Sequence, residues 1–268
     1  MAAPSKHHLL EDLAEEITAL RESAHWQHYL ACQARFHRYS PRNVLLISMQ
    51  RPDATQVAGF STWKSLGRNI KRGEKAIAIL APVIRKGSHD DEQEPRIGFR
   101  WVHVFDVTQT EGEALPSPVA LLDGQDPSCL EAQLSDLAVT LGFRVAYEEL
   151  ATGVNGELRW ATSLIVVAPH NPPLQRIKTI VHELGHALLH QHQGDRRRAE
   201  MEAESVAFVV LKALTIDSRP YSTGYVASWL GDHDDVSAAL LSCCANVHAA
   251  SSTILEGLLH IQANHDAA

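Results

Sequence analysis

The feature that most constrains this chain is the pentapeptide His182-Glu183-Leu184-Gly185-His186, an HExxH sequence. Histidines four residues apart lie on one face of a helix, about one turn from each other, so two imidazoles can bind one tetrahedral Zn²⁺ ion. A glutamate beside the first histidine can accept the proton of an attacking water molecule. The sequence therefore predicts a helix with His182 and His186 as zinc ligands and Glu183 as the catalytic general base.

The sequence around this pentapeptide is typical of a buried helix that follows a strand. One helix face is apolar and consists of Ile177, Ile180, Val181, Leu184 and Leu188. Asn171, Pro172 and Pro173 predict the start of the helix. The run from Leu164 to Ala168 predicts a short buried strand, along which a peptide substrate could pair. Strand, turn and HExxH helix follow each other in zinc-dependent peptidases, although a chain with 16 histidines can contain such a pair by coincidence.

Two histidines after the pentapeptide are alternatives for the third metal ligand. His192 occupies the last position of an HExxHxxGxxH pattern, but Leu189 replaces the glycine of that pattern, so the helix need not break there. His190 would have to lie on the same straight helix as the first two ligands, which gives poor tetrahedral geometry. We therefore expect the third ligand to come from a later segment.

That later segment is a second helix, which Gly194 separates from the first and which Arg196 begins. Packed against the HExxH helix, it can return a glutamate to the metal and complete a set of two histidines and one glutamate, as in gluzincins. We expect Glu202 to be this ligand, ahead of Glu204 and then Glu200. The alternative is that these glutamates are solvated acids beside an arginine run.

Composition and charge narrow the class of protein. A length of 268 residues allows one large or two medium domains, and a net charge of −8 argues against a general nucleic-acid-binding protein. The sequence shows no signal peptide, no apolar run of 18 residues and no CxxC pair. We therefore expect a soluble cytoplasmic protein with reduced thiols and no membrane partner.

The pattern of elements predicts an α+β fold with two domains. Residues 112–127 contain three prolines and two glycines without a period, so we expect domains over 1–114 and 128–268, joined by a linker over 115–127. Besides the two metal-site helices, helices are expected over 9–36, 40–49, 61–66, 128–141, 220–231 and 235–261. Strands are expected over 76–83, 97–105, 143–147, 158–160 and 164–168.

Positive charge is concentrated between Ala34 and Lys75, where nine basic residues stand against two acidic ones. Phe36, Tyr39, Phe60 and Trp63 are interleaved with these cations. Cations follow a phosphate backbone and exposed rings stack on unpaired bases, so the segment favours single-stranded nucleic acid over duplex. The alternative is a solvated basic face over core aromatic residues.

Longer motifs in the same segment carry a family resemblance. They are Tyr39-Ser40 with Arg42-Asn43, the block from Thr62 to Arg68, the run from Lys71 to Lys75, and the segment from Val104 to Gly112. Residues 5–112 resemble the N-terminal domain of the ArdC antirestriction family, which implies a single-stranded-DNA-binding domain. The residues that this resemblance and the charge pattern assign to the DNA are Arg38, Tyr39, Arg42, Asn43, Trp63, Lys64, Arg68, Lys71, Arg72 and Lys75.

The second half resembles the peptidase-like domain of the same family and, more distantly, the ImmA/IrrE family of zinc metallopeptidases. The resemblance rests on residues 181–190, 202–207 and 221–230. It implies that His182, His186 and a helix glutamate bind the metal and that Glu183 is catalytic. Two hypotheses follow: a zinc peptidase that cleaves an unknown protein substrate, or a non-proteolytic DNA-protecting protein whose zinc site is structural or vestigial. The candidates for an oxyanion-stabilising residue in the first are Tyr221, Tyr225, His233 and His248.

Overall fold

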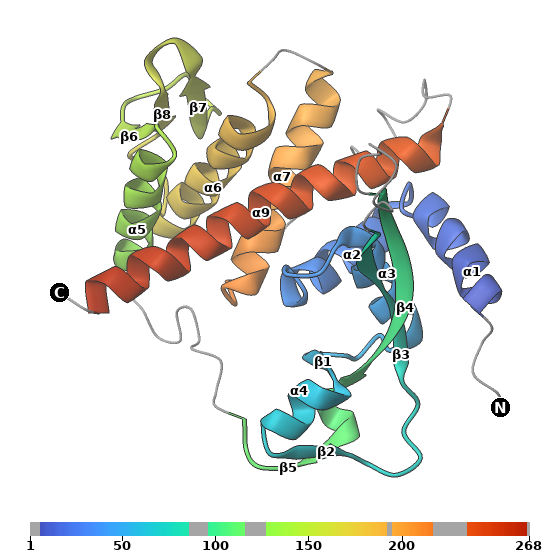
Figure 1. Ribbon diagram of the computed structural model, residues 1–268. Coiled ribbons are helices and arrows are strands. Elements are labelled where there is room, and N and C mark those ends of the chain that lie inside the picture. The colour runs from blue at the N-terminus through green and yellow to red at the C-terminus, as the bar shows by residue number, and fades with distance from the viewer. Residues whose placement is uncertain (1–5, 86–95, 116–126, 192–194, 217–234, 267–268) are drawn as a thin grey trace, which may run out of the picture. The chain divides into compact units, whose positions relative to one another are not determined.

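The computed structural model describes residues 6–85, 96–115, 127–191, 195–216 and 235–266 (Figure 1). The chain divides into two compact units, the first from Met1–Glu16 and Tyr39–Ser117, the second from Ile17–Arg38 and Pro118–Ala268. Each unit contains helices and strands, so the predicted α+β fold class with two domains is confirmed. In this division Ile17–Arg38 groups with the second unit, and the later boundary, between Ser117 and Pro118, falls within the expected linker.

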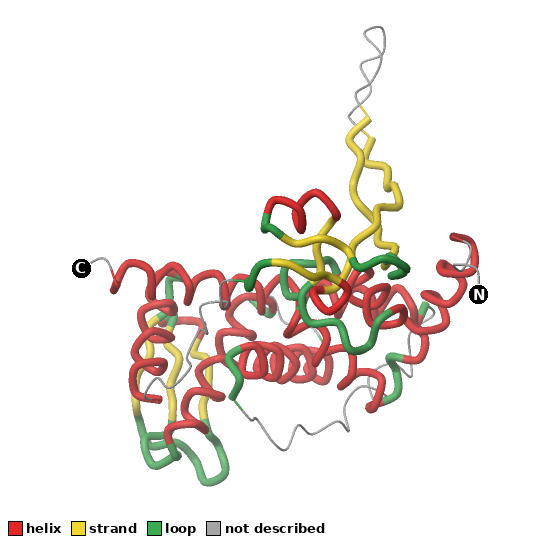
Figure 2. The backbone as a smooth tube through the Cα atoms, turned by 90° about the horizontal axis from the view of Figure 1, so that it is seen from below, coloured by secondary structure: helices red, strands yellow, loops and turns green. Residues whose placement is uncertain are grey.

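The first unit is built around two small antiparallel sheets. Strand β4 (Arg96–Asp106) pairs with both β1 (Val57–Gly59) and β3 (Ile77–Arg85), and Figure 2 shows β3 and β4 as a long two-stranded ribbon. The second sheet pairs β2 (Arg68–Ile70) with β5 (Thr110–Gly112). Helices α3 (Pro41–Gln50) and α4 (Phe60–Ser65) lie wholly in the first unit, and most of α1 (Lys6–Ala19) belongs to it as well. The three-residue strands β1, β2 and β5 were not predicted.

Helix α3 protects one edge of this unit's larger sheet. The Asn43 side chain accepts a hydrogen bond from the Leu80 N–H (2.9 Å) and donates one to the Leu80 carbonyl (2.8 Å). The Gln50 side chain makes the same pair of bonds with Ala78, at 2.9 and 2.8 Å. Two amide side chains thus satisfy backbone groups that the edge strand β3 would otherwise leave unpaired.

The described residues of the second unit form a three-stranded sheet and five long helices. The sheet has the order β6-β8-β7, with β6 (Arg144–Tyr147) parallel and β7 (Gly156–Arg159) antiparallel to β8 (Leu164–Val167). Strand β8 is the predicted strand before the HExxH helix, but it is central and has a neighbour on each edge. The prediction that a substrate pairs along β8 is therefore wrong, since both of its hydrogen-bonding edges are used.

The helices of this unit pack through apolar faces. They are α2 (Ser23–Arg35), α5 (Pro127–Thr140), α6 (Pro173–Leu189), α7 (Arg196–Ala213) and α9 (Val236–Asp266). The predicted face of α6 is buried at Ile177, Ile180, Val181 and Leu184. Helix α9 runs across α5, α6 and α7 (Figure 1). Within α9, Val236–Asn264 is long and apolar enough to cross a membrane, but a core helix packed in this way meets the same criterion.

Helix α2 covers helix α7. Trp26 is fully buried and its indole N–H donates to the Ser205 hydroxyl on α7 (3.2 Å). The predicted helix over residues 9–36 is in fact interrupted between Ala19, the end of α1 (Lys6–Ala19), and Ser23. This break comes beside residue 17, where the chain passes from one unit to the other. The helix expected over 220–231 lies outside the described residues.

Candidate metal centre

Helices α6 and α7 approach each other closely at the HExxH sequence. A Cβ atom added to Gly185 would lie 3.2 Å from the Ala203 Cα and 3.4 Å from the Val206 Cβ, tighter than most real contacts. The small residues at positions 185 and 203 therefore let the two backbones come together. This close packing brings the glutamates of α7 within reach of the histidines of α6.

His182, His186 and Glu200 form a compact set of donor atoms. The Nε2 atoms of His182 and His186 are 3.1 Å apart, and the Glu200 Oε2 lies 3.5 Å from the first and 3.7 Å from the second. Ligand atoms around a tetrahedral zinc ion are separated by roughly 3.3–3.6 Å, given the usual zinc–ligand distances. The size of this triangle and its two-imidazole, one-carboxylate composition fit a divalent metal ion.

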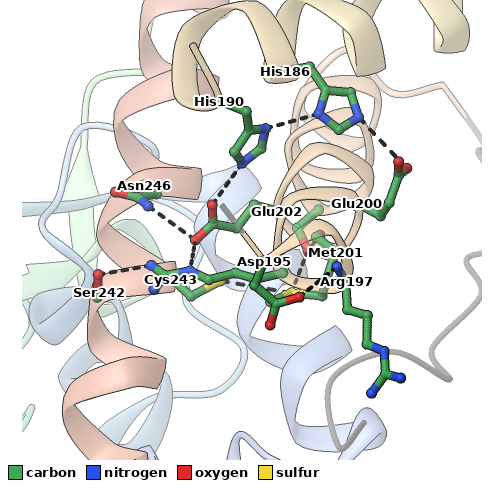
Figure 3. Close-up of polar contacts among 12 residues, drawn as sticks. His186, His190, Asp195, Arg197, Glu200, Met201, Glu202, Ser242, Cys243 and Asn246 are labelled. Atoms are coloured by element: carbon green, nitrogen blue, oxygen red, sulfur yellow. Dashed lines mark hydrogen bonds and ion pairs between the residues drawn. The ribbon is translucent and has the colours of Figure 1, made fainter. Parts of the chain in front are cut away.

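The structure brings Glu200, rather than the expected Glu202, to the histidine pair. Side chains two residues apart on a helix point in nearly opposite directions, so only one of these glutamates can face His182 and His186. Glu202 is 2% exposed and its carboxylate accepts hydrogen bonds from His190, Arg198 and Asn246 instead. The sequence order of preference therefore differs from the observed geometry, in which Glu200 lies near the Nε2 atoms of both histidines. Figure 3 shows its contact with His186.

Glu200 and His186 have the charge states that a metal cation requires, whereas His182 does not. Hydrogen bonds from His182 and His186 hold the pKa of Glu200 well below its usual range, so this carboxylate is ionised. Burial lowers the pKa of His182, but hydrogen bonds to Glu200 and Glu204 outweigh burial and raise the pKa to about 9. Burial lowers the pKa of His186, which favours its neutral form. A metal ion that binds here must displace the proton of His182.

Glu183 lies inside the unit beside the edge strand β7. Its side chain is buried and a Cβ atom added to Gly156 would lie 3.5 Å from the Glu183 Oε1. Burial raises the pKa of Glu183 to about 7, with further increases from Glu200 and Glu157 and an opposing effect of His182. Such a carboxyl group can both accept and donate a proton near neutral pH.

The predicted DNA-binding residues fall into two groups. Tyr39, Asn43, Trp63 and Arg68 hold the first unit together. The Tyr39 hydroxyl donates to the Val57 carbonyl (2.9 Å), Asn43 bonds β3, and Arg68 bonds the side chain of Thr110 (2.7 Å). Trp63 is 2% exposed and its indole donates to the Phe105 carbonyl (2.8 Å), so it offers no ring face for stacking.

The other predicted residues are at the surface. They are Arg38, Arg42, Lys64, Lys71, Arg72 and Lys75. Lys71 donates to the Thr108 carbonyl (2.8 Å). Arg38 belongs to the second unit and the other five to the first, so the basic segment does not form one surface within a single unit.

Two phenylalanines of the first unit are exposed: Phe60, named above only among the aromatic residues of the basic segment, and Phe99, which was not predicted as a binding residue. Phe99 is 63% exposed and Phe60 is 58% exposed. Phe99, Trp101, His103 and Phe105 alternate along β4, so they lie on one face of the sheet, opposite the face of the buried Val104. This alternation was visible in the sequence, but it identified a strand and did not reveal which face is exposed.

The other residues considered as metal ligands or oxyanion-stabilising groups are not part of the set of His182, His186 and Glu200. His190 begins the turn after α6 and contacts His186 and Glu202. His248 accepts a hydrogen bond from the Gln33 side chain (2.6 Å). His192, Gly194, Tyr221, Tyr225 and His233 lie outside the described residues.

Fold and site together define a two-domain protein with a candidate metal centre at its HExxH sequence, and comparisons with known proteins match a family model to each half. Residues 7–113 match the N-terminal domain of anti-restriction factor ArdC, and residues 138–223 match the IrrE N-terminal-like domain. The chain is an ArdC-like protein.

Two solved structures share the fold of this chain. The antirestriction protein ArdC from the R388 plasmid has been crystallised in metal-free and Mn(II)-bound forms. The metal-free form is 18% identical, with a TM-score of 0.54 over 83% of this chain and 86% of that one. The Mn(II)-bound form is 17% identical, with a TM-score of 0.54 over 82% and 85%. An uncharacterized protein of Bacillus anthracis is 25% identical over 250 residues, which span 76% of this chain and only 42% of that protein.

Proposed function

We propose that this protein is a zinc-dependent peptide hydrolase whose first unit binds single-stranded DNA. The observation that carries the hydrolase proposal is the juxtaposition of a buried Glu183 with the triangle of His182, His186 and Glu200. A structural metal site has no need of a buried proton acceptor next to its ligands. The unidentified substrate is a protein.

In this proposal His182, His186 and Glu200 hold the metal ion. When bound, a divalent cation supplies Lewis-acid polarisation of the scissile carbonyl and makes an attacking water molecule more acidic. Two imidazoles and one carboxylate suit Zn²⁺, which such ligands bind more tightly than Mn²⁺. The Mn(II)-bound form of the ArdC relative supports a divalent cation, and the donor chemistry favours zinc.

Glu183 moves the proton. It accepts a proton from the attacking water and then donates it to the leaving amine nitrogen. A pKa of about 7, raised chiefly by burial, suits both steps. A cation held by His182 and His186 would lower this pKa, because it stabilises the ionised carboxylate, and would favour the proton-accepting form.

Strand β7 can align the substrate. Among the described residues, β7 pairs only with β8, so its other edge has backbone groups available for an extended peptide. Gly156 of β7 lies next to Glu183, so a peptide paired with this edge would pass close to the proton acceptor. This role replaces the one expected for the inner strand β8.

The DNA-binding part of the proposal rests on the first unit. Exposed Phe60 and Phe99 can stack on bases, and the exposed cations Arg42, Lys64 and Arg72 can contact phosphates. Likeness to the ArdC N-terminal domain and to an antirestriction protein of a plasmid supports a role in protecting incoming DNA in the cytoplasm. Four free cysteines in the described residues fit a reducing compartment.

The test of the hydrolase uses the full chain, loaded with Zn²⁺, and an unfolded protein substrate with and without single-stranded DNA. We expect cleavage by the wild type and a loss of about 10²–10⁴-fold in Glu183→Gln, which keeps the shape of the side chain but cannot accept the proton. Zinc content and circular dichroism should be unchanged in this variant. Equal cleavage by both proteins would exclude Glu183 as the catalytic base.

A non-proteolytic DNA-protecting protein is the second candidate function. It is favoured by the exposed phenylalanines and cations of the first unit, because these residues could bind DNA without a metal ion. The two candidate functions can be distinguished in cells that carry the Glu183→Gln variant, by measuring how well plasmid DNA is protected from restriction. Full protection by this variant would support the second candidate, whereas loss of protection with intact DNA binding would support the hydrolase.

A further inference from the structure

The residues behind the histidine ligands form a hydrogen-bonded chain that ends at Glu202 (Figure 3). The Nδ1 atom of His186, on the ring side away from the metal set, lies 2.9 Å from the Nδ1 of His190. The Nε2 of His190 lies 3.0 Å from the Glu202 Oε2. His186 therefore contacts a buried carboxylate through a second imidazole.

Only one arrangement of protons lets His186 bind a metal through Nε2. Its Nε2 must then carry a lone pair, so its proton is on Nδ1 and donates to His190. The His190 Nδ1 must accept, so the His190 proton is on Nε2 and donates to the Glu202 carboxylate. Each contact in the chain then has one donor and one acceptor, with the ionised carboxylate at its end.

Glu202 is fixed in place by groups from two helices. Its Oε1 accepts from the Arg198 Nε (2.8 Å) on α7 and from the Asn246 Nδ2 (3.1 Å) on α9. Arg198 is itself bound to the Ser242 hydroxyl of α9 (2.9 Å). At 2% exposure, this carboxylate cannot turn towards the metal set without losing several partners.

His182 has a separate carboxylate behind it. Its Nδ1 lies 3.3 Å from the Glu204 Oε2, and the Glu204 Oε1 accepts from the Lys178 ammonium group at 2.6 Å. The two histidines are thus held independently, His182 directly by Glu204 and His186 through His190 by Glu202.

We propose that His190 and Glu202 are positioning residues that set the tautomer and ring orientation of His186 for metal binding, and that Glu204 does the same for His182. This inference rests on the metal centre of the proposed function. Partners of this kind raise the basicity of a histidine ligand, and their loss typically lowers metal affinity by about 10–100-fold. The three glutamates of α7 then have two different roles: Glu200 is a ligand, and Glu202 and Glu204 position the histidine ligands.

The experiment measures the Zn²⁺ affinity of the full chain by competition with a chromophoric chelator. His190→Leu, which keeps the bulk of the side chain but has no polar atom, should bind zinc about 10–100-fold more weakly. His190→Gln, whose amide can accept from His186 and donate to Glu202, should recover much of this loss. If His190 only fills space, His190→Leu should bind zinc as tightly as His190→Gln or more tightly.

Double variants test the two separate supports. His190→Leu combined with Glu202→Gln should bind zinc about as weakly as His190→Leu alone, because both act through one chain. His190→Leu combined with Glu204→Gln should show the sum of the two single effects in free energy. Lys212→Gln, an exposed charge at the end of α7, is the matched control and should bind zinc like the wild type.

Long-range ¹H–¹⁵N NMR of the zinc-loaded protein gives a readout that does not depend on affinity. The wild type should show His186 protonated at Nδ1, and His190→Leu should broaden or shift this signal. If the wild type binds zinc and His190→Leu binds it equally well, the chain of positioning residues is excluded while the metal centre stands. A wild type that binds no zinc would overturn the metal centre and the inference with it.

Discussion

The metal centre of the second unit and the predicted DNA-binding face of the first unit differ in how their residues divide between structure and function. In the candidate metal centre, the donor atoms of His182, His186 and Glu200 lie together, and the buried Glu183 interacts electrostatically with His182 and Glu200. In the first unit, Tyr39, Asn43 and Trp63 come from motifs of the same specificity but are part of the fold. A long motif therefore identifies a domain, and only burial separates the residues that contact a ligand from those that position them.

The largest effect should come from Trp63→Ala. Removal of this buried indole and its hydrogen bond should lower the stability of the first unit by about 3–5 kcal/mol. Denaturant unfolding followed by circular dichroism measures this loss, and zinc binding by the second unit is the internal control. A variant that stays folded but no longer binds single-stranded DNA would contradict the structural role and restore Trp63 as a stacking residue.

Metal binding should stabilise the second unit alone. Zinc at 100 times its dissociation constant should add about 2.7 kcal/mol to the unfolding free energy of the unit that contains the site. Hydrogen exchange monitored by mass spectrometry can follow both units in one sample, and protection should rise in α6 and α7 but not in β3 and β4. His182→Ala should abolish the effect. Equal protection of both units would mean that they unfold together.

Strongly periodic elements could be predicted from the sequence. The apolar face of α6, with a proline in its first turn, specifies a helix locally. The predicted face is buried at Ile177, Ile180, Val181 and Leu184 and half-buried at Leu188. Strands β1, β2 and β5 are three residues long, too short for alternation to distinguish them from loops. The contact of Trp26 with Ser205 joins residues 179 positions apart, which no local pattern can reveal.

The histidine pair of the site could be predicted for the same reason, since one helical turn fixes its geometry. The glutamate could not. Positions 200, 202 and 204 carry the same residue type, and the choice among them depends on the register between α6 and α7, where Gly185 meets Ala203. Register is a property of tertiary packing and cannot be read from the sequence. In the structure Glu200 faces the Nε2 atoms of the histidine pair, whereas Glu202 and Glu204 lie behind the histidines.

Phe99→Ala should weaken DNA binding without a loss of stability. A stacked base contributes about 1–3 kcal/mol, so the affinity for single-stranded DNA should fall by about 5–150-fold. Unfolding free energy should change by no more than about 0.5 kcal/mol, because the ring is 63% exposed. Fluorescence anisotropy with a labelled oligonucleotide measures the affinity. Unchanged affinity here, with weaker binding in Phe60→Ala, would move the stacking site to α4.

The smallest effect should come from single surface cations, and it should appear in the salt dependence of DNA binding. Arg72 is exposed in the turn between β2 and β3, and Arg72→Gln removes one charge without removing a buried contact. If Arg72 neutralises one phosphate, the slope of log affinity against log salt should fall in magnitude by about 0.7, the value for one contact with a single strand. Arg144→Gln, an exposed cation of the second unit, is the matched control and should leave the slope unchanged. An equal fall of the slope in both variants would show that the DNA responds to total charge and not to a face of the first unit.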